Sequence, residues 1–193
     1  ILKRIDPDTD LIGISIDHGC QHNIALSIIA AIKRNFPGKP IALGGVHATE
    51  SYKDFLDGGA DYIILGEGEE TVLELCRAIN RPATNKALKG IDGLAYKIGG
   101  KIMANPKTRY IKDIDILPFP ARDMFPLKNY FKSKLIHSPV NHNHTPIISS
   151  RGCPCKCSFC SIPLFWNGTW RARTPKNVVD EMEECVIKYN IRE

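Results

Sequence analysis

Apolar residues in the first 80 positions alternate between short continuous runs and longer stretches with helical spacing. The short runs are typical of strands buried on both faces of a parallel sheet, and they lie at residues 11–16, 40–43 and 62–65. Each run is followed by a segment that predicts a helix, at residues 22–36, 51–56 and 69–80. Three strand–helix repeats require right-handed crossovers onto one parallel sheet, so this part of the chain predicts an α/β fold.

The pattern changes after residue 85. Residues 94–98 and 101–103 alternate around Gly99-Gly100, which predicts a β-hairpin because glycine accepts the positive φ angles of a two-residue turn. Residues 113–146 carry five prolines and no sustained periodicity, which indicates a linker, and residues 147–149 are a candidate strand. Thr174-Pro175 predicts the start of a helix, whose apolar stripe consists of Val178, Val179, Met182, Val186 and Tyr189. We therefore expect three regions, at residues 1–85, 86–145 and 146–193.

Length and charge narrow the class of protein. The chain has 193 residues, somewhat more than one domain of about 150, and it starts at Ile1 without an initiator Met, so we expect a piece of a longer protein. No apolar run approaches the roughly 18 residues of a membrane span. The net charge of +5 comes from scattered basic residues, which favours solvated surfaces over a nucleic-acid interface.

Seven cysteines are distributed unevenly along the chain. Four of them lie within residues 153–160, whereas Cys20, Cys76 and Cys185 are isolated. A disulfide framework spreads cysteines along a small secreted chain, and the first residues here lack the apolar core of an export signal. The dense group therefore indicates metal or redox chemistry in a reducing compartment, the cytoplasm.

The spacing within this group favours an iron–sulfur cluster over zinc. Structural zinc usually takes two separated pairs of ligands, so that two chain segments surround the ion. Here all four thiols lie on one loop, and a larger cluster can be held at three corners by such a loop. The neighbouring Gly, Pro, Lys and Ser residues offer no apolar core, which argues against buried, unreactive thiols.

Residues 149–161 (SSRGCPCKCSFCS) closely resemble the cluster loop of radical S-adenosylmethionine enzymes, which have Cys-x3-Cys-x2-Cys with an aromatic residue before the last cysteine. The resemblance implies that Cys153, Cys157 and Cys160 bind three irons of a 4Fe–4S cluster, while the open fourth iron binds S-adenosylmethionine. It places Phe159 in the cofactor site and leaves Cys155 as a bystander. It also implies that residues 146–193 begin a partial TIM barrel, with the cluster loop after the first strand.

Glycine-bearing or polar loops follow the three predicted strands, at the edge where open α/β sheets bind ligands. Taken singly, each loop is more typical of a plain turn. Together, residues 10–15, 43–49 and 61–69 resemble the later half of the Rossmann-like cobalamin-binding domain that precedes many radical S-adenosylmethionine barrels, and residues 117–122 (LPFPAR) resemble its linker. The resemblance implies that the loops line the groove for the cobalamin nucleotide tail. The cofactor-binding residues predicted on this basis are Ser15, Gly44, Gly45, His47, Gly66, Glu67 and Gly68.

The histidines do not offer a cobalt ligand at the expected spacing. Related corrinoid proteins carry this ligand in a D-x-H-x-x-G loop, which would lie before Ile1. Asp17-His18-Gly19 follows a later strand, so we interpret His18 as a solvated loop residue. His47 is more typical of loop packing than of metal ligation. The three histidines of the proline-rich region are typical of a polar linker: His137, His142 and His144.

The leading hypothesis is a cobalamin-dependent radical S-adenosylmethionine enzyme that transfers a methyl group to an unactivated carbon, or catalyses a related radical rearrangement or cyclisation. Its partners would be a small-molecule substrate and a reductant protein such as flavodoxin or ferredoxin. A methylthiotransferase-like enzyme is an alternative, but it needs three N-terminal cysteines for a second cluster, and only Cys20 and Cys76 are available. A third hypothesis is a non-catalytic iron–sulfur binding or electron-transfer module. Because most of a barrel would follow Glu193, we expect residues 1–193 alone to be inactive.

Overall fold

The chain folds into two compact units in the computed structural model, which describes residues 2–80, 85–132 and 143–192. The first, called here the sheet unit, comprises residues 1–110 and 153–168. The second, called the linker unit, comprises residues 111–152 and 169–193. The cysteine loop therefore belongs to the sheet unit, although it is far from that unit's strands in sequence.

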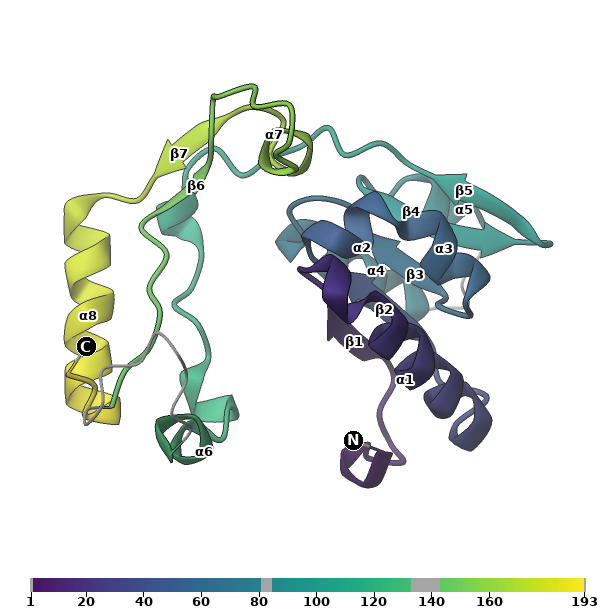
Figure 1. Ribbon diagram of the computed structural model, residues 1–193, viewed down its shortest axis with the longest axis horizontal. Helices are drawn as coiled ribbons and strands as arrows, with labels where there is room; N and C mark the ends of the chain where they lie inside the picture. Colours follow the sequence, from purple (N-terminus) through teal and green to yellow (C-terminus); the bar gives the residue numbers. More distant parts are fainter. Residues whose placement is uncertain (1, 81–84, 133–142, 193) are drawn as a thin grey trace. The chain divides into compact units, whose positions relative to one another are not determined.

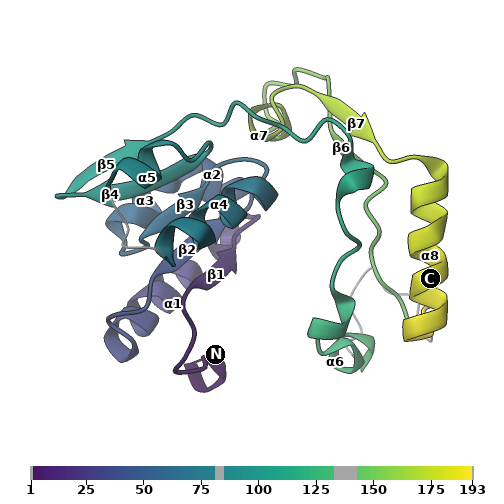
Figure 2. The ribbon, with the colours of Figure 1, turned by 180° about the vertical axis from the view of Figure 1, so that it is seen from behind.

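The sheet unit is built on five strands in the order β1-β2-β3-β4-β5 (Figures 1 and 2). Their bounds are Ile12–Ser15, Ile41–Gly44, Tyr62–Ile64, Leu94–Ile98 and Lys101–Ala104. β1, β2 and β3 are parallel, which confirms the predicted α/β fold, and β4 and β5 form the predicted hairpin. β4 also pairs antiparallel with β3, so the hairpin extends the same sheet rather than standing apart from it.

Helices cover both faces of this sheet. They are α1 (His22–Asn35), α2 (Val46–Glu50), α3 (Tyr52–Asp57), α4 (Glu69–Ile79) and α5 (Asn85–Lys89). Side chains alternate between the two faces of a strand, so Leu43 packs with Phe55 of α3 in one buried cluster, whereas the neighbouring Ala42 packs with Leu75 of α4 in the other. β2 and β3 are thus buried on both sides, as their continuous sequences predict. The same prediction is wrong for β1, where Ile12 and Ile14 are half-buried and Gly13 and Ser15 are exposed.

The helix predicted at residues 51–56 is confirmed as α3, and the structure adds a helix before it, α2, that the sequence analysis did not predict. The two helices are separated at Ser51, whose φ of −103° and ψ of 28° interrupt the helical backbone. The first of them starts early because the amides of His47 and Ala48 both donate to the Ile16 carbonyl, at 3.1 and 3.2 Å. This long-range contact has no signal in the local sequence pattern.

The linker unit contains less regular structure. It includes α6 (Leu127–Lys132), β6 (Ser150–Gly152), β7 (Trp170–Ala172) and α8 (Pro175–Tyr189), together with short 3-10 turns at Ile114–Ile116 and Arg122–Met124. The strand predicted at residues 147–149 forms three residues later, as β6, which pairs antiparallel with β7. Of the predicted residues, Ser149 takes part at the end of this pairing, where its carbonyl accepts a hydrogen bond from the Arg173 amide at 2.9 Å. The start of a barrel in this region stays a prediction.

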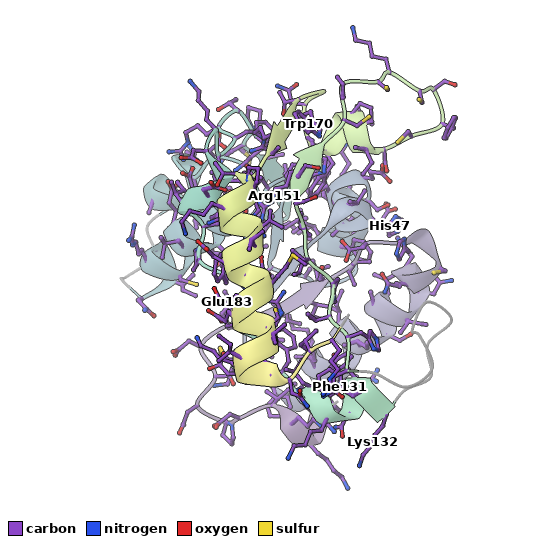
Figure 3. All side chains as sticks on the ribbon, turned by 90° about the vertical axis from the view of Figure 1, so that its left-hand side faces the viewer. His47, Phe131, Lys132, Arg151, Trp170 and Glu183 are labelled. Carbon is purple, nitrogen blue, oxygen red and sulfur yellow. The ribbon has the colours of Figure 1, made fainter. Side chains whose placement is uncertain are left out.

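Helix α8 begins where the sequence predicts, with the Thr174 side chain accepting a hydrogen bond from the Asn177 amide. The predicted apolar stripe of this helix is largely exposed, since Val179, Met182 and Val186 are each at least half exposed. The buried positions are Glu181 and Cys185. By contrast, Glu183, labelled in Figure 3, is exposed. Within the described ranges, no helix is both long and apolar enough to cross a bilayer.

Candidate cofactor site

Three loops leave the sheet at the carboxyl ends of β1, β2 and β3 (Figure 1). Because these strands are parallel and adjacent, their carboxyl ends meet at one edge, and the register pairs Ser15 directly with Gly44. Gly45 and the Gly66-Glu67-Gly68 loop follow β2 and β3. The structure thus brings the predicted residues of all three loops to the edge where open α/β sheets bind ligands.

The first two loops are bonded to each other, and this contact requires glycine at position 45. Gly45 has a φ of +99°, and a Cβ there would lie 2.5 Å from Asp17 Oδ1 and 2.6 Å from the Ile16 carbonyl. Asp17 also accepts a hydrogen bond from the Val46 amide at 3.4 Å. The absence of a side chain at Gly45 is therefore explained by packing inside the protein.

Ser15 and Gly44 leave free space at the same edge. Ser15 is exposed, and its hydroxyl donates to Asp17 Oδ2 at 3.2 Å. A Cβ at Gly44 would meet only Ile64 Cβ, at an ordinary 3.8 Å. Internal packing therefore does not account for glycine at position 44, in contrast to Gly45.

His47 forms a pair with His22, which the sequence analysis missed. His22 Nδ1 and His47 Nε2 are 3.0 Å apart, so one ring donates a hydrogen bond and the other accepts it. Both rings pack on Phe55, with centroid separations of 4.7 Å for His22 and 5.8 Å for His47. The pair joins the start of α1 to the start of α2, which agrees with the interpretation of His47 as a loop-packing residue.

Thr49 joins the second loop to the third. Its hydroxyl donates to the Gly45 carbonyl at 3.0 Å and accepts from the Gly66 amide at the same distance. In the third loop Glu67 is only 3% exposed, so its carboxylate is enclosed by protein. A Cβ at Gly68 would lie 3.1 Å from Ile64 Cγ2, which indicates close packing of the start of α4 on β3.

A network of charged side chains supports the third loop. Lys107 lies 3.5 Å from Asp92, both side chains are at most 10% exposed, and Lys107 also donates to the Thr71 hydroxyl at 3.2 Å. Burial by itself would raise the pKa of Asp92, but hydrogen bonds from Thr108 and the Arg109 amide, with the charge of Lys107, hold this pKa below its ordinary value. No local sequence pattern marks these residues.

The cysteine loop is open to solvent. Cys155 and Cys157 are exposed, Cys153 and Cys160 are half-buried, and the Cys160 amide donates to the Cys157 carbonyl at 3.2 Å. A hydrogen bond with the Cys153 thiol, and the negative charges of Cys153 and Cys157, raise the pKa of the Cys155 thiol. The Phe159 side chain is 91% exposed.

The donor set of this loop fits an iron–sulfur cluster by its chemistry, because cysteine thiolates are the ligands that such clusters take. The thiols are not assembled into a binding geometry: among the residues that the structure describes, no three Cys, His, Asp or Glu side chains come together to hold a metal ion. The loop would therefore have to close around its metal, with Cys153, Cys157 and Cys160 as the predicted ligands.

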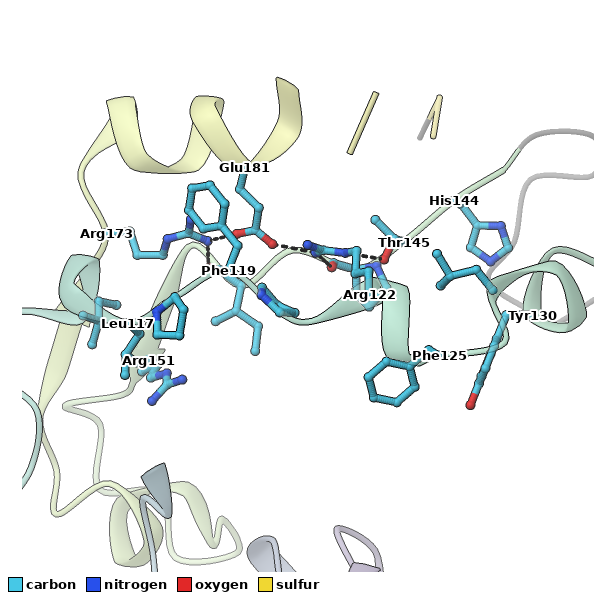
Figure 4. A pocket seen from close by; sticks show the side chains of 16 residues that line it. Leu117, Phe119, Arg122, Phe125, Tyr130, His144, Thr145, Arg151, Arg173 and Glu181 are labelled. Atoms are coloured by element: carbon cyan, nitrogen blue, oxygen red, sulfur yellow. Dashed lines mark hydrogen bonds and ion pairs between the residues drawn. The ribbon is translucent and has the colours of Figure 1, made fainter. Parts of the chain in front are cut away.

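The linker unit encloses a separate, mainly apolar cavity of about 570 Å³ (Figure 4). At its wall Arg122 donates to Glu181 Oε1 at 2.5 Å and to the Pro146 carbonyl at 3.1 Å. The other oxygen of Glu181 accepts from Arg173. Glu181 is 1% exposed and Arg122 5%, so a carboxylate and two guanidinium groups form the polar centre of this unit. The predicted cofactor-site residues do not line this cavity.

Comparison with known proteins relates this chain to cofactor-dependent enzymes. The B12 binding domain family matches residues 2–76. An uncharacterized methyltransferase of Pyrococcus horikoshii is 30% identical over 195 residues, which are 100% of this chain and 40% of the relative. The anaerobic magnesium-protoporphyrin IX monomethyl ester cyclase of Cereibacter sphaeroides is 34% identical over 151 residues, 77% of this chain and 24% of the relative. The chain thus spans less than half of either relative.

A solved structure shows the same fold. The radical S-adenosylmethionine methyltransferase TsrM from Kitasatospora setae, with cobalamin and a 4Fe–4S cluster bound, superposes with a TM-score of 0.66 at 20% identity, over 93% of this chain and 35% of that protein. Residues 2–76 therefore match the B12 binding domain family, and the chain as a whole is similar to the methyltransferase and the cyclase and shares the fold of TsrM.

Proposed function

We propose that this chain supplies the cobalamin-binding and cluster-binding segments of a 4Fe–4S-dependent radical S-adenosylmethionine enzyme, which transfers a methyl group to an unactivated carbon or performs a related radical reaction. One observation carries the proposal: the loop with Cys153-x3-Cys157-x2-Cys160 belongs to the same compact unit as the B12-binding domain. The methyltransferase and cyclase relatives support an enzyme of this class.

Cys153, Cys157 and Cys160 would bind three irons. When bound, the cluster supplies the electron that cleaves S-adenosylmethionine, and cobalamin carries the methyl group. The exposed loop can rearrange around a cluster at little cost, because Cys155 and Cys157 have no packing to lose. Phe159 would lie against a cofactor, which would cover a ring that is otherwise 91% exposed.

Ser15, Gly44, Gly66 and Gly68 would line the cobalamin groove. Gly44 supports this assignment because the protein leaves open the space that a side chain would take there. Gly45, His47 and Glu67 would act on the groove by shaping its loops: Gly45 permits contact with the first loop, His47 is paired with His22, and Glu67 is buried.

The other assignments also belong to this proposal. They are the domain boundaries at 1–85, 86–145 and 146–193, a small-molecule substrate, a protein reductant such as flavodoxin or ferredoxin, and a cytoplasmic location. A one-electron donor is required because cleavage of S-adenosylmethionine consumes an electron that the chain's own side chains do not supply.

The cluster assignment is tested by anaerobic reconstitution of the chain with iron and sulfide. We expect about four irons per chain and an absorption band near 400 nm, on the three-cysteine model of ligation. Cys157→Ala should lose both, because only two ligands would remain. Cys20→Ala, which removes an exposed cysteine outside the loop, should keep both.

Cys155→Ala decides between ligand sets. Retention of about four irons in this variant supports ligation by the other three cysteines. Loss of the cluster in Cys155→Ala, with retention in Cys157→Ala, would show that the assignment is wrong.

The groove is tested by Gly44→Ala, with cobalamin retention on a desalting column as the measurement. The added methyl group meets no protein atom closer than 3.8 Å, so the fold is preserved while the groove is partly filled, and retention should fall. Gly38→Ala is the matched control, because its Cβ has no neighbour within 4 Å and lies in the turn before β2, at the opposite edge of the sheet. Equal retention in both variants would contradict the groove assignment.

A further inference from the structure

The segment after the last cysteine of the loop packs onto the sheet unit. It contains α7, one helical turn at Ile162–Phe165, which contacts α2. Helices this short are unstable in isolation, because few hydrogen bonds offset the cost of ordering the backbone. Phe165 is nevertheless only 8% exposed. Packing against the rest of the unit, rather than helix propensity, therefore holds α7 in place.

The main-chain carbonyl of Phe165 lies directly against the third loop. A Cβ at Gly66 would be 3.2 Å from this oxygen and 3.6 Å from the Tyr110 hydroxyl. The Tyr110 hydroxyl donates a hydrogen bond to the same oxygen at 3.4 Å. Glycine at position 66 is thus required twice, by its φ of +65° and by the close approach of Phe165.

Gly66 faces two ways. Its amide donates to the Thr49 hydroxyl, which in turn donates to the Gly45 carbonyl. Its α-carbon faces Phe165. A continuous set of contacts therefore runs from the second loop, through the third loop, to the segment that carries the cysteines.

We propose that Tyr110 and Gly66 form an anchor for Phe165, and that this anchor fixes the cysteine loop on the carboxyl edge of the sheet. Tyr110 is then a positioning residue for the cluster-bearing loop; this consequence rests on the function proposed above. The constraint is tight because Phe165 is only five positions after Cys160. Five residues of fully extended chain span at most about 18 Å.

The anchor is tested first in the chain without cofactors, by hydrogen exchange of the amides in residues 161–168. Four of these amides form hydrogen bonds within the turn, namely those of Leu164, Phe165, Trp166 and Gly168. In Gly66→Ala we expect their exchange to accelerate about fivefold or more, as for a docking contact equal to one hydrogen bond, and Cys160 to be alkylated faster by iodoacetamide.

Gly99→Ala is the matched control. Gly99 has a similar φ, +56° against +65°, so the backbone strain of an alanine is comparable, but a Cβ there has no neighbour within 4 Å. Exchange in residues 161–168 should be unchanged in this variant. Equal acceleration in Gly66→Ala and Gly99→Ala, or none in either, would overturn the anchor.

Tyr110→Phe removes only the hydroxyl that donates to Phe165. This variant tests the anchor if Gly66→Ala does not fold. The same amides should exchange faster, whereas Tyr130→Phe, at an exposed tyrosine of α6, should leave them unchanged. Unchanged exchange in Tyr110→Phe would contradict the role of Tyr110.

A spectroscopic measurement separates positioning from general stability. In the chain loaded with cob(II)alamin and a reduced cluster, both centres are paramagnetic, so the microwave-power saturation of the cobalamin signal depends on their separation. We expect Tyr110→Phe to keep the iron and cobalamin contents but to alter this saturation, and an unaltered saturation would count against the positioning role. If the chain binds neither cofactor, the proposed function fails, while the exchange measurement still decides the anchor.

Discussion

The two units of this chain have different kinds of interior. The sheet unit is centred on apolar strands that are buried on both faces, with Leu43, Ile63 and Leu94 fully enclosed. The linker unit is centred on a carboxylate between two guanidinium groups, Glu181 with Arg122 and Arg173. Apolar packing is tolerant and nondirectional, whereas a buried carboxylate requires specific partners in specific places. The units should therefore respond differently to substitution.

The largest effect is expected for Glu181→Ala. It removes the partner of two arginines whose side chains are at most 10% exposed, and an uncompensated buried charge costs about 3–5 kcal/mol. Hydrogen exchange of the α8 amides measures the loss within the linker unit. Glu183→Ala, at an exposed position of the same helix, should change stability by less than about 0.5 kcal/mol. Similar values for both variants would show that the ion cluster does not stabilise this unit.

The next effect is expected for Leu43→Ala in the sheet unit. Leu43 is 0% exposed, and removal of three carbons from such a position costs about 2–5 kcal/mol through lost burial and the cavity left behind. The hydrogen exchange of the backbone amides in α1 and β2 should be faster in this variant. Leu73→Ala, at a half-exposed position of α4, should cost much less, and comparable losses would mean that this core is not tightly packed.

The smallest effect is a pH dependence confined to the sheet unit. The pKa of Asp92 is lowered in the folded chain below 3.8, so its contribution to stability is complete above that value and is lost as the pH falls through the folded pKa. The urea midpoint of this unit should fall as the pH is lowered below about 4, and Asp92→Asn should reduce that fall. Asp57→Asn, which removes the charge of an exposed ion pair, should leave the pH dependence of the urea midpoint unchanged. If Asp92→Asn showed the same pH dependence as the unsubstituted chain, the role of Asp92 would be contradicted.

The same difference in interiors explains which parts of the fold could be predicted from sequence. The parallel strands and their helices follow from local runs of apolar residues, and the Gly99-Gly100 turn follows from two glycines with φ of +56° and +79°. The pairing of β4 with β3 has no local signal. Likewise, Glu181 at a buried position of α8 can be understood only with Arg122, which lies 59 residues earlier.

In the candidate site, too, some features follow from local sequence and others depend on residues far apart in the chain. The cysteine spacing and the glycine loops are local motifs, and the structure brings the loops to one edge as expected. The supports behind them, Thr49 and Lys107, act through partners distant in sequence. The pair of His22 and His47 could have been found from the sequence. His22 is the first residue of the helix after β1, and His47 is the second residue of the helix after β2, so the two histidines lie at the same end of neighbouring parallel strands.

The Thr49 hydroxyl has a thermodynamic consequence for any ligand of these loops. Because it holds Gly45 and Gly66 together, the second and third loops lose their conformational freedom when the protein folds. A ligand that enters at this edge then meets backbone that is already ordered. The entropy cost of ordering the loops is therefore incurred when the protein folds and not when the ligand binds. More of the free energy of the ligand contacts then contributes to affinity.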